Sequence, residues 1–455
     1  MTTSPSDDFV TGQGAGWRAG YLAGVMAERR RAKGGGGGSN PRSPLLDSLM
    51  EDWSGLFEAE VLPRMGPTSR AVLAQVNRAG RDAVRLSPSD LACAGRTVGV
   101  KLKLMDFVGS VARLAWAREN GCPWVAPTFA LIAHRGDLVT LQWGRENGCP
   151  WSAGACRAAS FGGHMDMVQW LIATGADVNY TSPRDGTTAV YVAAYQGHLD
   201  VVGLLIDAGA DINTANTDTG ATPLDAAAQQ GHTDVVTRLV AAGADVNTSL
   251  TDIGTTPLHV AARNGQTDVV ALLLSAPGVD VNRADTLDDA TPLFAAAQEG
   301  HVEVVERLLA APGMTVNLAT NIGATPLYIA AQNRHVEVVE RLIAAPGVDV
   351  NLAHVTGATP LFVAAQIGHT DVAAQLTAAP GVDVNQARTD TGATPLFAAA
   401  QNGHADVVER LLAAPGVDVN HARLTGTTPL STALAFGHAD VVQKLRAAGA
   451  TEPHG

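Results

Sequence analysis

One short motif, Thr-Pro-Leu, returns at a nearly constant interval and limits what this chain can fold into. Its prolines lie 34 or 35 residues apart, and an asparagine that follows Val or Ile keeps the same step. The prolines are Pro223, Pro257, Pro292, Pro326, Pro360, Pro395 and Pro429; the asparagines are Asn179, Asn213, Asn247, Asn282, Asn317, Asn351, Asn385 and Asn420. A fixed period of this length indicates a stack of similar small units.

The first half of each unit has the signals of a short helix. In the central unit Thr325 offers a hydroxyl cap, and Pro326 stands where a missing amide proton costs nothing. Ala330 and Ala331 follow at helical spacing and are small enough to let a neighbouring helix approach. A glycine ends this helix in most units (Gly231, Gly265, Gly300, Gly368, Gly403). Arg334 stands at that place in the central unit, so we expect slight strain in its turn.

The second half predicts another helix, with one apolar face. Val338, Val339, Leu342 and Ile343 recur at i, i+1, i+4 and i+5, which places them on one side. The helix should stop before Pro346, because proline disfavours helical geometry in the preceding residue. A short extended segment, the finger, then leads through the repeated asparagine to the next Thr-Pro-Leu.

The stretch from Gly392 to Leu412, Gly-Ala-Thr-Pro-Leu-Phe-Ala-Ala-Ala-Gln-Asn-Gly-His-Ala-Asp-Val-Val-Glu-Arg-Leu-Leu, resembles an ankyrin repeat. The resemblance covers residues 153–455. It implies an all-α ankyrin-repeat solenoid of helix-turn-helix units with short β-hairpin fingers. The family period is near 33 residues, and the longer step here comes from Ala-Pro-Gly (Ala311–Gly313) in place of Ala-Gly, from a longer finger, or from both. Loops absorb such an insertion at little cost in free energy.

The N-terminal part of the chain has a different character. Residues 1–44, which end in a glycine-rich linker, should be a disordered tail. Residues 45–100 predict a small helical segment that either caps the solenoid or resembles an F-box. The F-box resemblance implies a Skp-type adaptor as partner, docked on Leu62, Val72, Leu73 and Val76.

Residues 101–152 predict short repeats without fingers. Glu-Asn-Gly-Cys-Pro-Trp occurs at 119–124 and again at 146–151, a step of 27 residues that leaves no room for a finger. Such units are similar to those of ankyrin-type proteins of algae and other protists, in which an F-box-like segment often precedes them. Residues 153–455 then form the main repeat array.

The composition argues against nucleic acid and membrane as partners, and the cysteines indicate a cellular compartment. The formal net charge of −13 argues against a general nucleic-acid binder, which needs a cationic face. The sequence contains no run of 18 or more apolar residues, so we expect no membrane span. The four cysteines lack paired short spacing, so we expect a reduced intracellular compartment, cytoplasmic or nuclear. We expect a monomer.

Periodic histidines invite a metal-site hypothesis, but their spacing favours a structural role. They are His164, His198, His232, His301, His335, His369, His404 and His438. Packed helices lie roughly 8–10 Å apart, whereas zinc–nitrogen bonds are about 2 Å long. We therefore expect these side chains to hydrogen-bond across repeats. No nucleophile, base and orienting group stand together, so the sequence predicts neither an enzyme nor a cofactor.

Function should lie in positions that the stack does not need. In the ankyrin family partners usually contact the finger tips and the exposed edge of the first helix. Carried over here, the edge positions are Tyr195, Gln196, Gln229, Gln230, Arg263, Asn264, Gln298, Glu299, Gln332, Asn333, Gln366, Ile367, Gln401 and Asn402. A second row follows Thr-Pro-Leu: Asp225, His259, Phe294, Tyr328, Phe362 and Phe397. Its aromatic members either anchor a partner or, as we favour, pack between repeats.

Three functions follow from these patterns. The first is a non-catalytic scaffold or adaptor that binds unidentified protein partners through one concave face. The second is the substrate-recognition subunit of a cullin-type ubiquitin ligase, which needs the F-box-like segment. The third, which we disfavour, is a metal protein or enzyme. Nearly the same side chains recur along the edge. Either the partner is itself extended and repetitive, or the central array serves mainly as a spacer.

Overall fold

The computed structural model describes residues 110–119 and 126–452. The chain divides into two compact units, residues 1–127 and 128–455, and the repeat array lies in the second. The predicted tail (1–44) and the F-box-like segment with Leu62, Val72, Leu73 and Val76 lie outside the described residues. What we inferred about them therefore stays a prediction.

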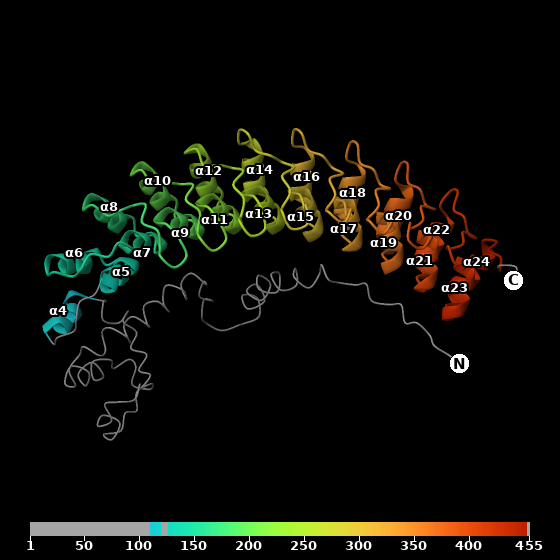
Figure 1. Cartoon of the computed structure of the whole chain (residues 1–455), viewed down its shortest axis with the longest axis horizontal. Helices are drawn as coiled ribbons and strands as arrows, with labels where there is room; N and C mark the ends of the chain where they lie inside the picture. The colour runs from blue at the N-terminus through green and yellow to red at the C-terminus, as the bar shows by residue number, and fades with distance from the viewer. Residues whose placement is uncertain (1–109, 120–125, 453–455) are drawn as a thin grey trace, which may run out of the picture. The chain divides into compact units, whose positions relative to one another are not determined.

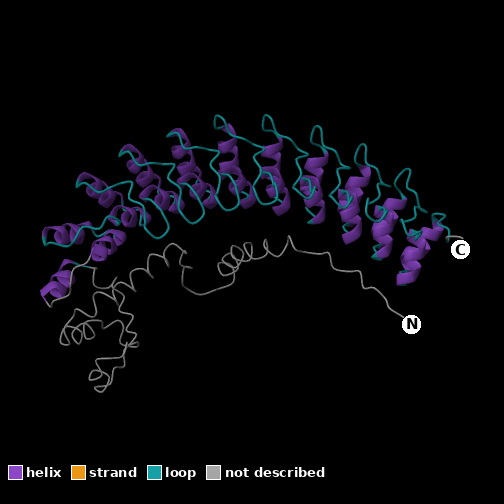
Figure 2. Cartoon of the chain, in the orientation of Figure 1, coloured by secondary structure: helices purple, strands orange, loops and turns teal. Residues whose placement is uncertain are grey.

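The second unit is built from pairs of antiparallel helices joined by short connections (Figures 1 and 2). The first helices of the pairs are α5 (Ala126–Arg135), α7 (Ala155–Phe161), α9 (Ala189–Gln196), α11 (Pro223–Gln230), α13 (Pro257–Asn264), α15 (Pro292–Glu299), α17 (Pro326–Gln332), α19 (Pro360–Ile367), α21 (Pro395–Gln401) and α23 (Pro429–Phe436). The second helices are α6 (Leu138–Glu146), α8 (Met165–Ala173), α10 (Leu199–Asp207), α12 (Thr233–Ala241), α14 (Thr267–Ser275), α16 (Val302–Leu309), α18 (Val336–Ile343), α20 (Thr370–Ala378), α22 (Ala405–Leu412) and α24 (Ala439–Ala447). The first unit contributes α4 (Val111–Glu119).

From α9 to α24 the helix pairs stack side by side in an arc. The odd-numbered first helices lie on its inner side and the even-numbered second helices on its outer side (Figure 1). Each first helix packs on the first helices of the neighbouring pairs and on the second helix of its own pair. None of the described helices is long and apolar enough to cross a membrane.

The ends of the first helices follow the predicted signals. Thr325 has extended backbone geometry, and its hydroxyl accepts a hydrogen bond from the Tyr328 amide at 3.1 Å. Gly300 ends α15 in the left-handed region at φ 78°. Arg334 adopts φ 61° at the equivalent place in the next repeat, a geometry that suits glycine better. The left-handed backbone of Arg334 therefore accounts for the strain predicted in this turn.

The second helices bury the predicted apolar face. Val338, Val339 and Leu342 are at most 1% exposed, whereas Ile343, the fourth member of the predicted stripe, is only half-buried. Charged residues occupy the outer side, where Arg341 Nε lies 2.6 Å from Glu306 Oε1 of the preceding repeat. Both side chains of this ion pair are about half exposed, so it contributes little stability compared with the buried face.

A ladder of histidines links each helix pair to the one before it. In the eight repeats that carry the periodic histidine, the ring Nε2 lies 2.9–3.2 Å from a backbone carbonyl oxygen at the end of the preceding first helix. At seven of these eight junctions the ring also covers the glycine of that turn; a Cβ added at Gly300, for example, would lie 2.5 Å from His335. At the eighth, His369, the turn residue is Arg334. The expected cross-repeat hydrogen bonding is confirmed. Gln266 replaces histidine at one junction and covers Gly231 in the same way.

A second ladder runs along the repeated asparagines. Asn317 Oδ1 accepts the Asp349 amide at 3.0 Å, and Asn317 Nδ2 donates to the Gly347 carbonyl at 2.7 Å. Equivalent bonds from Oδ1 to the next repeat are made by Asn179, Asn213, Asn247, Asn282, Asn351, Asn385 and Asn420. Each asparagine therefore satisfies backbone groups in the loop that follows the second helix of the next repeat.

The fingers are hydrogen-bonded turns, and no strand forms in residues 110–119 or 126–452. Asn216 N donates to Ala221 O at 2.9 Å within one finger, and Thr251 N donates to Thr219 O at 2.9 Å between two fingers. One backbone bond at a junction cannot make the ladder that paired strands require. The expected β-hairpin shape is thus reduced to a tight turn, in which side chains such as Asn216 replace ladder bonds.

We predict that His335→Ala lowers the free energy of unfolding by about 1–3 kcal/mol, because it removes a hydrogen bond and the packing over Gly300. His335→Gln should cost clearly less, since Gln266 fills the same place at another junction. Urea unfolding followed by circular dichroism measures both. His421→Ala is the control, because His421 lies outside the ladder. Equal effects at positions 335 and 421 would contradict a structural role for the ladder.

Candidate functional site

The ends of the first helices form a continuous edge on the inner side of the arc (Figure 1). Seven of the predicted edge residues are exposed: Gln229, Gln230, Gln332, Asn333, Gln366, Ile367 and Asn402. The other seven are half-buried: Tyr195, Gln196, Arg263, Asn264, Gln298, Glu299 and Gln401. None belongs to the buried core, so all of them can take part in a surface.

Some of these side chains already hold the fold together. Asn264 Nδ2 donates to the Val260 carbonyl at 3.0 Å, and Asn402 Nδ2 makes the same bond within its own helix at 2.9 Å. Arg263 contacts His259 Nε2 through one guanidinium nitrogen at 3.0 Å. The exposed glutamines of the edge are therefore better placed to meet a partner than its asparagines.

The histidine ladder sets the register of this edge. The carbonyls it binds belong to edge residues: His369 reaches Gln332 O, His404 reaches Gln366 O, and His438 reaches Gln401 O. Because the backbone carbonyl of one edge position in each of these repeats is tied to the next repeat, the glutamines at these positions recur at one fixed step. The edge offers amide donors and acceptors on a rigid frame.

The row that follows Thr-Pro-Leu is buried, which confirms packing between repeats over partner anchoring. Phe294, Phe362 and Phe397 are 1–3% exposed and Tyr328 is 9% exposed. A finger residue of the next repeat covers three of these rings. The His354 ring stacks on Tyr328 at 5.5 Å, and the guanidinium groups of Arg388 and Arg423 lie 5.5 and 5.1 Å from the centres of Phe362 and Phe397. These cation–π contacts tie finger to helix.

Asp225 brings a carboxyl group into the same buried row. It is 3% exposed, and its Oδ2 accepts hydrogen bonds from Thr222 N and Oγ1 at 2.9 and 2.7 Å. Among the described residues its Oδ1 has no hydrogen-bond partner. Burial disfavours the ionised form and raises the pKa of Asp225 to about 6, against the lowering effect of the Thr222 bonds.

Sequence reasoning missed the apolar character of several fingers. Leu287, Ile322, Val355 and Leu424 expose 50–75% of their surface at the finger turns. The finger positions predicted from the family resemblance were Asp218, Asp252, Asp288, Val355 and Asp390, of which only Val355 is apolar. Periodicity singles out buried residues and not exposed ones. The available signal was an apolar residue one or two positions before the left-handed turn residue, which is Gly323, Gly357 or Gly426 in three fingers and Asp289 in the fourth.

The cysteines and acidic residues of the described part do not gather into a metal site. No group of three His, Cys, Asp or Glu side chains converges there. Cys149 and Cys156 are buried, and burial raises the pKa of these thiols to about 12 and about 11. Thiols held in the protonated form are weak nucleophiles, so these two pack as small apolar residues.

Helix pairs, finger turns and cross-repeat ladders together define a helix-turn-helix solenoid. A family model described as ankyrin repeats (3 copies) matches residues 155–249, 215–285, 258–354, 293–388, 338–423 and 361–453. These overlapping matches span most of the chain, which therefore belongs to the ankyrin-repeat family. The family is generally non-catalytic, and its repeats serve as protein–protein interaction scaffolds. No curated protein matches the chain.

The raised pKa of Asp225 predicts a pH dependence. Between pH about 4 and about 6 the folded chain binds a proton that the unfolded chain has lost, so stability falls as pH rises through this range. Asp225→Asn removes this titration, and the variant should gain up to about 3 kcal/mol relative to the wild type between pH 4 and pH 7. Urea unfolding at several pH values measures the difference. A difference that does not change with pH would contradict a buried, titrating Asp225.

Proposed function

We propose that the chain is a non-catalytic scaffold or adaptor that binds protein partners along the inner edge of the repeat array. The observation that carries this proposal is the fixed register of exposed side chains that the fold does not use. Gln332 and Gln366 occupy equivalent places in adjacent repeats, both are exposed, and the carbonyl of each is tied to a histidine. Such a surface loses little conformational entropy when a partner binds, because its backbone is already held in place.

The chemistry of the edge favours an extended protein partner. Glutamine amides both donate and accept hydrogen bonds, so they can pair with the peptide groups of a bound chain whatever its side chains. Their recurrence at positions 229, 298, 332, 366 and 401 offers the same contact in repeat after repeat. Arg263 interrupts the series and gives one repeat a positive charge. The partner should therefore present a regular backbone with an acidic group near that repeat.

Proximity labelling in the source cell tests the proposal. The full chain is compared with a double variant, Gln332→Lys and Gln366→Lys, that adds charge to the edge without touching a buried group. We expect the labelling of direct partners to fall at least about fivefold, because unpaired charge in an interface is costly. Circular dichroism confirms that the variant is folded.

The matched control adds the same charge on the outer helices through Thr237→Lys and Gln443→Lys, both at exposed positions. This variant should keep the wild-type set of labelled proteins. If the edge variant labels the same proteins as the wild type, or if only the control loses them, the inner edge is not the binding surface.

A further inference from the structure

One finger of the array closes on its own carboxyl groups. Asp285 N donates to Ala290 O at 2.9 Å, and Asp285 Oδ1 accepts hydrogen bonds from the amides of Asp288 and Ala290 at 3.1 and 3.2 Å. Asp285 is 5% exposed, so its carboxyl group lies inside the turn and not in solvent. We call residues 285–290 the acidic finger, because Asp285, Asp288 and Asp289 give it three carboxyl groups.

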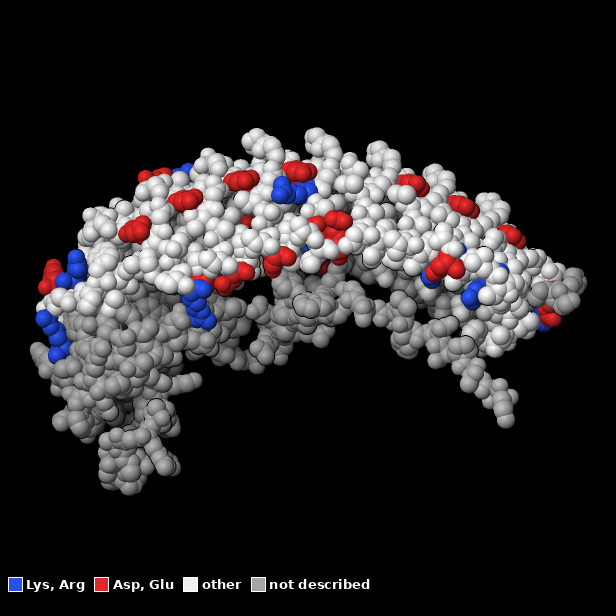
Figure 3. All heavy atoms as spheres, viewed as in Figure 1, with Lys and Arg blue, Asp and Glu red and all other residues white. Residues whose placement is uncertain are grey.

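Three carboxyl groups in one turn are unusual in this array. The equivalent turns of the other described fingers carry at most one. Charged side chains on the visible face of the molecule are few and scattered over uncharged surface (Figure 3). In the described part of the chain, acidic groups do not converge as metal ligands do. Repulsion among carboxyl groups within one turn is therefore specific to the acidic finger.

The carboxyl groups of Asp285 and Asp288 lie within hydrogen-bonding reach of each other. A carboxylate only accepts hydrogen bonds, so the two groups can bond to each other only while one of them carries a proton. Burial, the neighbouring Asp288 carboxylate and this hydrogen bond raise the pKa of Asp285 from its ordinary value of 3.8, against the lowering effect of the two amide bonds. The pair therefore holds one proton more tightly than a free aspartate does.

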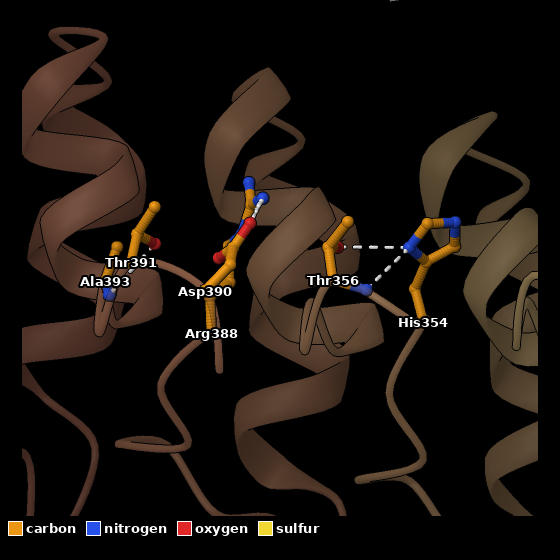
Figure 4. Close-up of polar contacts among 6 residues, drawn as sticks. All are labelled: His354, Thr356, Arg388, Asp390, Thr391 and Ala393. Carbon is orange, nitrogen blue, oxygen red and sulfur yellow. Dashed lines mark hydrogen bonds and ion pairs between the residues drawn. The ribbon is translucent and has the colours of Figure 1, made fainter. Parts of the chain in front are cut away.

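Other fingers are closed by neutral or oppositely charged groups. Asn216 Oδ1 accepts two amides of its own finger, as Asp285 does, but through a neutral amide group. Arg388 Nε donates to Asp390 Oδ1 at 3.0 Å, and His354 Nδ1 accepts a neighbouring amide at 3.2 Å (Figure 4). Among the described fingers, only the acidic finger joins two carboxyl groups.

The backbone of the acidic finger is strained as well. Asp289 adopts φ 60°, whereas the same place holds glycine in the neighbouring fingers, as at Gly254 and Gly323. A residue other than glycine in this region costs free energy, and the surrounding contacts must hold it there. Loss of a contact inside the turn should therefore open the acidic finger readily.

The acidic finger is bonded to both of its neighbours. Thr286 N donates to Ile253 O at 3.0 Å on one side, and Asn321 N donates to Asp288 O at 2.8 Å on the other. Because Asp288 carries both a member of the carboxyl pair and one of these backbone bonds, a shift of this residue is passed to the next finger.

Few opposite charges surround the pair. The titratable and charged groups on the elements packed against the acidic finger are Asp252 on the preceding finger, His259 and Arg263 on α13 and Glu299 on α15; Arg283 precedes the turn, and residues 320–324 of the following finger carry none. Arg263 contacts His259 Nε2 at 3.0 Å, and Arg283 is exposed. Histidine can also change charge near neutral pH, so the experiment includes a variant at position 259.

We propose that Asp285 and Asp288 form a proton-dependent latch: one proton shared by the two carboxyl groups keeps the acidic finger closed, and its release loosens the finger and its bonds to both neighbours. The proton leaves to water, and two carboxylates that repel each other remain. The stability that the latch contributes is fully present below pH about 4 and is lost as the pH rises through the raised pKa of Asp285. This inference goes beyond partner binding, because the latch acts in the chain alone.

Hydrogen exchange of the full chain, followed by mass spectrometry from pH about 4 to about 7, tests the latch. Rates are divided by those of an unstructured reference, which removes the intrinsic effect of pH and leaves the protection due to structure. Protection of residues 285–291 should fall at least about threefold over this range relative to residues 388–394, because the closed finger loses its bound proton. Equal pH dependence in both fingers would overturn the proposal.

Asparagine variants remove the shared proton and keep the shape of the side chains. In Asp288→Asn and in Asp285→Asn the acidic finger should lose its extra pH dependence, and Asn216 shows that an amide can close a finger with the same bonds. Asp390→Asn is the matched control, since that carboxyl group is bonded to Arg388, and it should leave the acidic finger unchanged. Circular dichroism confirms folding. If both asparagine variants keep the fall in protection, the carboxyl pair is not a latch.

Three further variants separate the latch from other effects. Asp289→Gly relieves the backbone, so it should raise protection of the acidic finger at every pH while the fall with pH remains. Asp225→Asn and His259→Phe remove other buried groups that titrate, and the fall should remain in both; Phe294 already fills the equivalent place in the next repeat. Loss of the fall in either of these two variants would assign the pH dependence to that residue and overturn the latch.

Discussion

Burial between neighbouring helix pairs is the interaction on which the rest of this structure depends. One pair is too small to enclose its own apolar face, so Val338, Val339 and Leu342 are shielded only when the adjacent pairs are in place. The alanines of the first helices serve the same end, because small side chains let successive helices approach closely. Stability is therefore shared along the array, and each junction matters to the units on both sides of it.

Hydrophobic burial alone would let neighbouring repeats slide, and two polar ladders prevent this. The histidines bind carbonyls at the ends of the first helices, while the asparagines bridge the backbone beside the second helices. The ladders thus hold each junction at two places, on both sides of the apolar layer. Buried apolar contacts supply most of the free energy, and the directional hydrogen bonds fix the register.

That division leaves two surfaces outside the apolar layer, the inner edge and the fingers, and they differ in character. The inner edge repeats nearly the same amide side chain at each step and so suits a regular partner backbone. The fingers vary: Asp252, Leu287, Ile322, Val355 and Arg388 give successive turns different charge and polarity. Variation is tolerated at Asp252, Leu287, Ile322 and Val355 because these side chains lie outside both the apolar layer and the ladders, whereas Arg388 covers the buried Phe362 ring.

Sequence by itself determined the repeat, its helix pairs and the buried stripes, because helix capping and 3.6-residue periodicity are local properties. It also indicated that the histidines bond across repeats and that Phe362 and Phe397 pack inward. The edge residues from Tyr195 to Asn402 were predicted from a family resemblance, and their part in binding stays a proposal. The segment with Leu62 and Leu73 lies outside the described residues.

Only the tertiary structure decided which side chains meet between repeats. The stacking of His354 on Tyr328, the placement of Arg388 and Arg423 over buried rings, and the bond from Val355 N to Ile322 O join residues of adjacent repeats. The raised pKa of Asp225 likewise follows from burial that no local pattern reveals. Local sequence sets the shape of each unit, but contacts across a junction depend on the rotation and rise from one unit to the next.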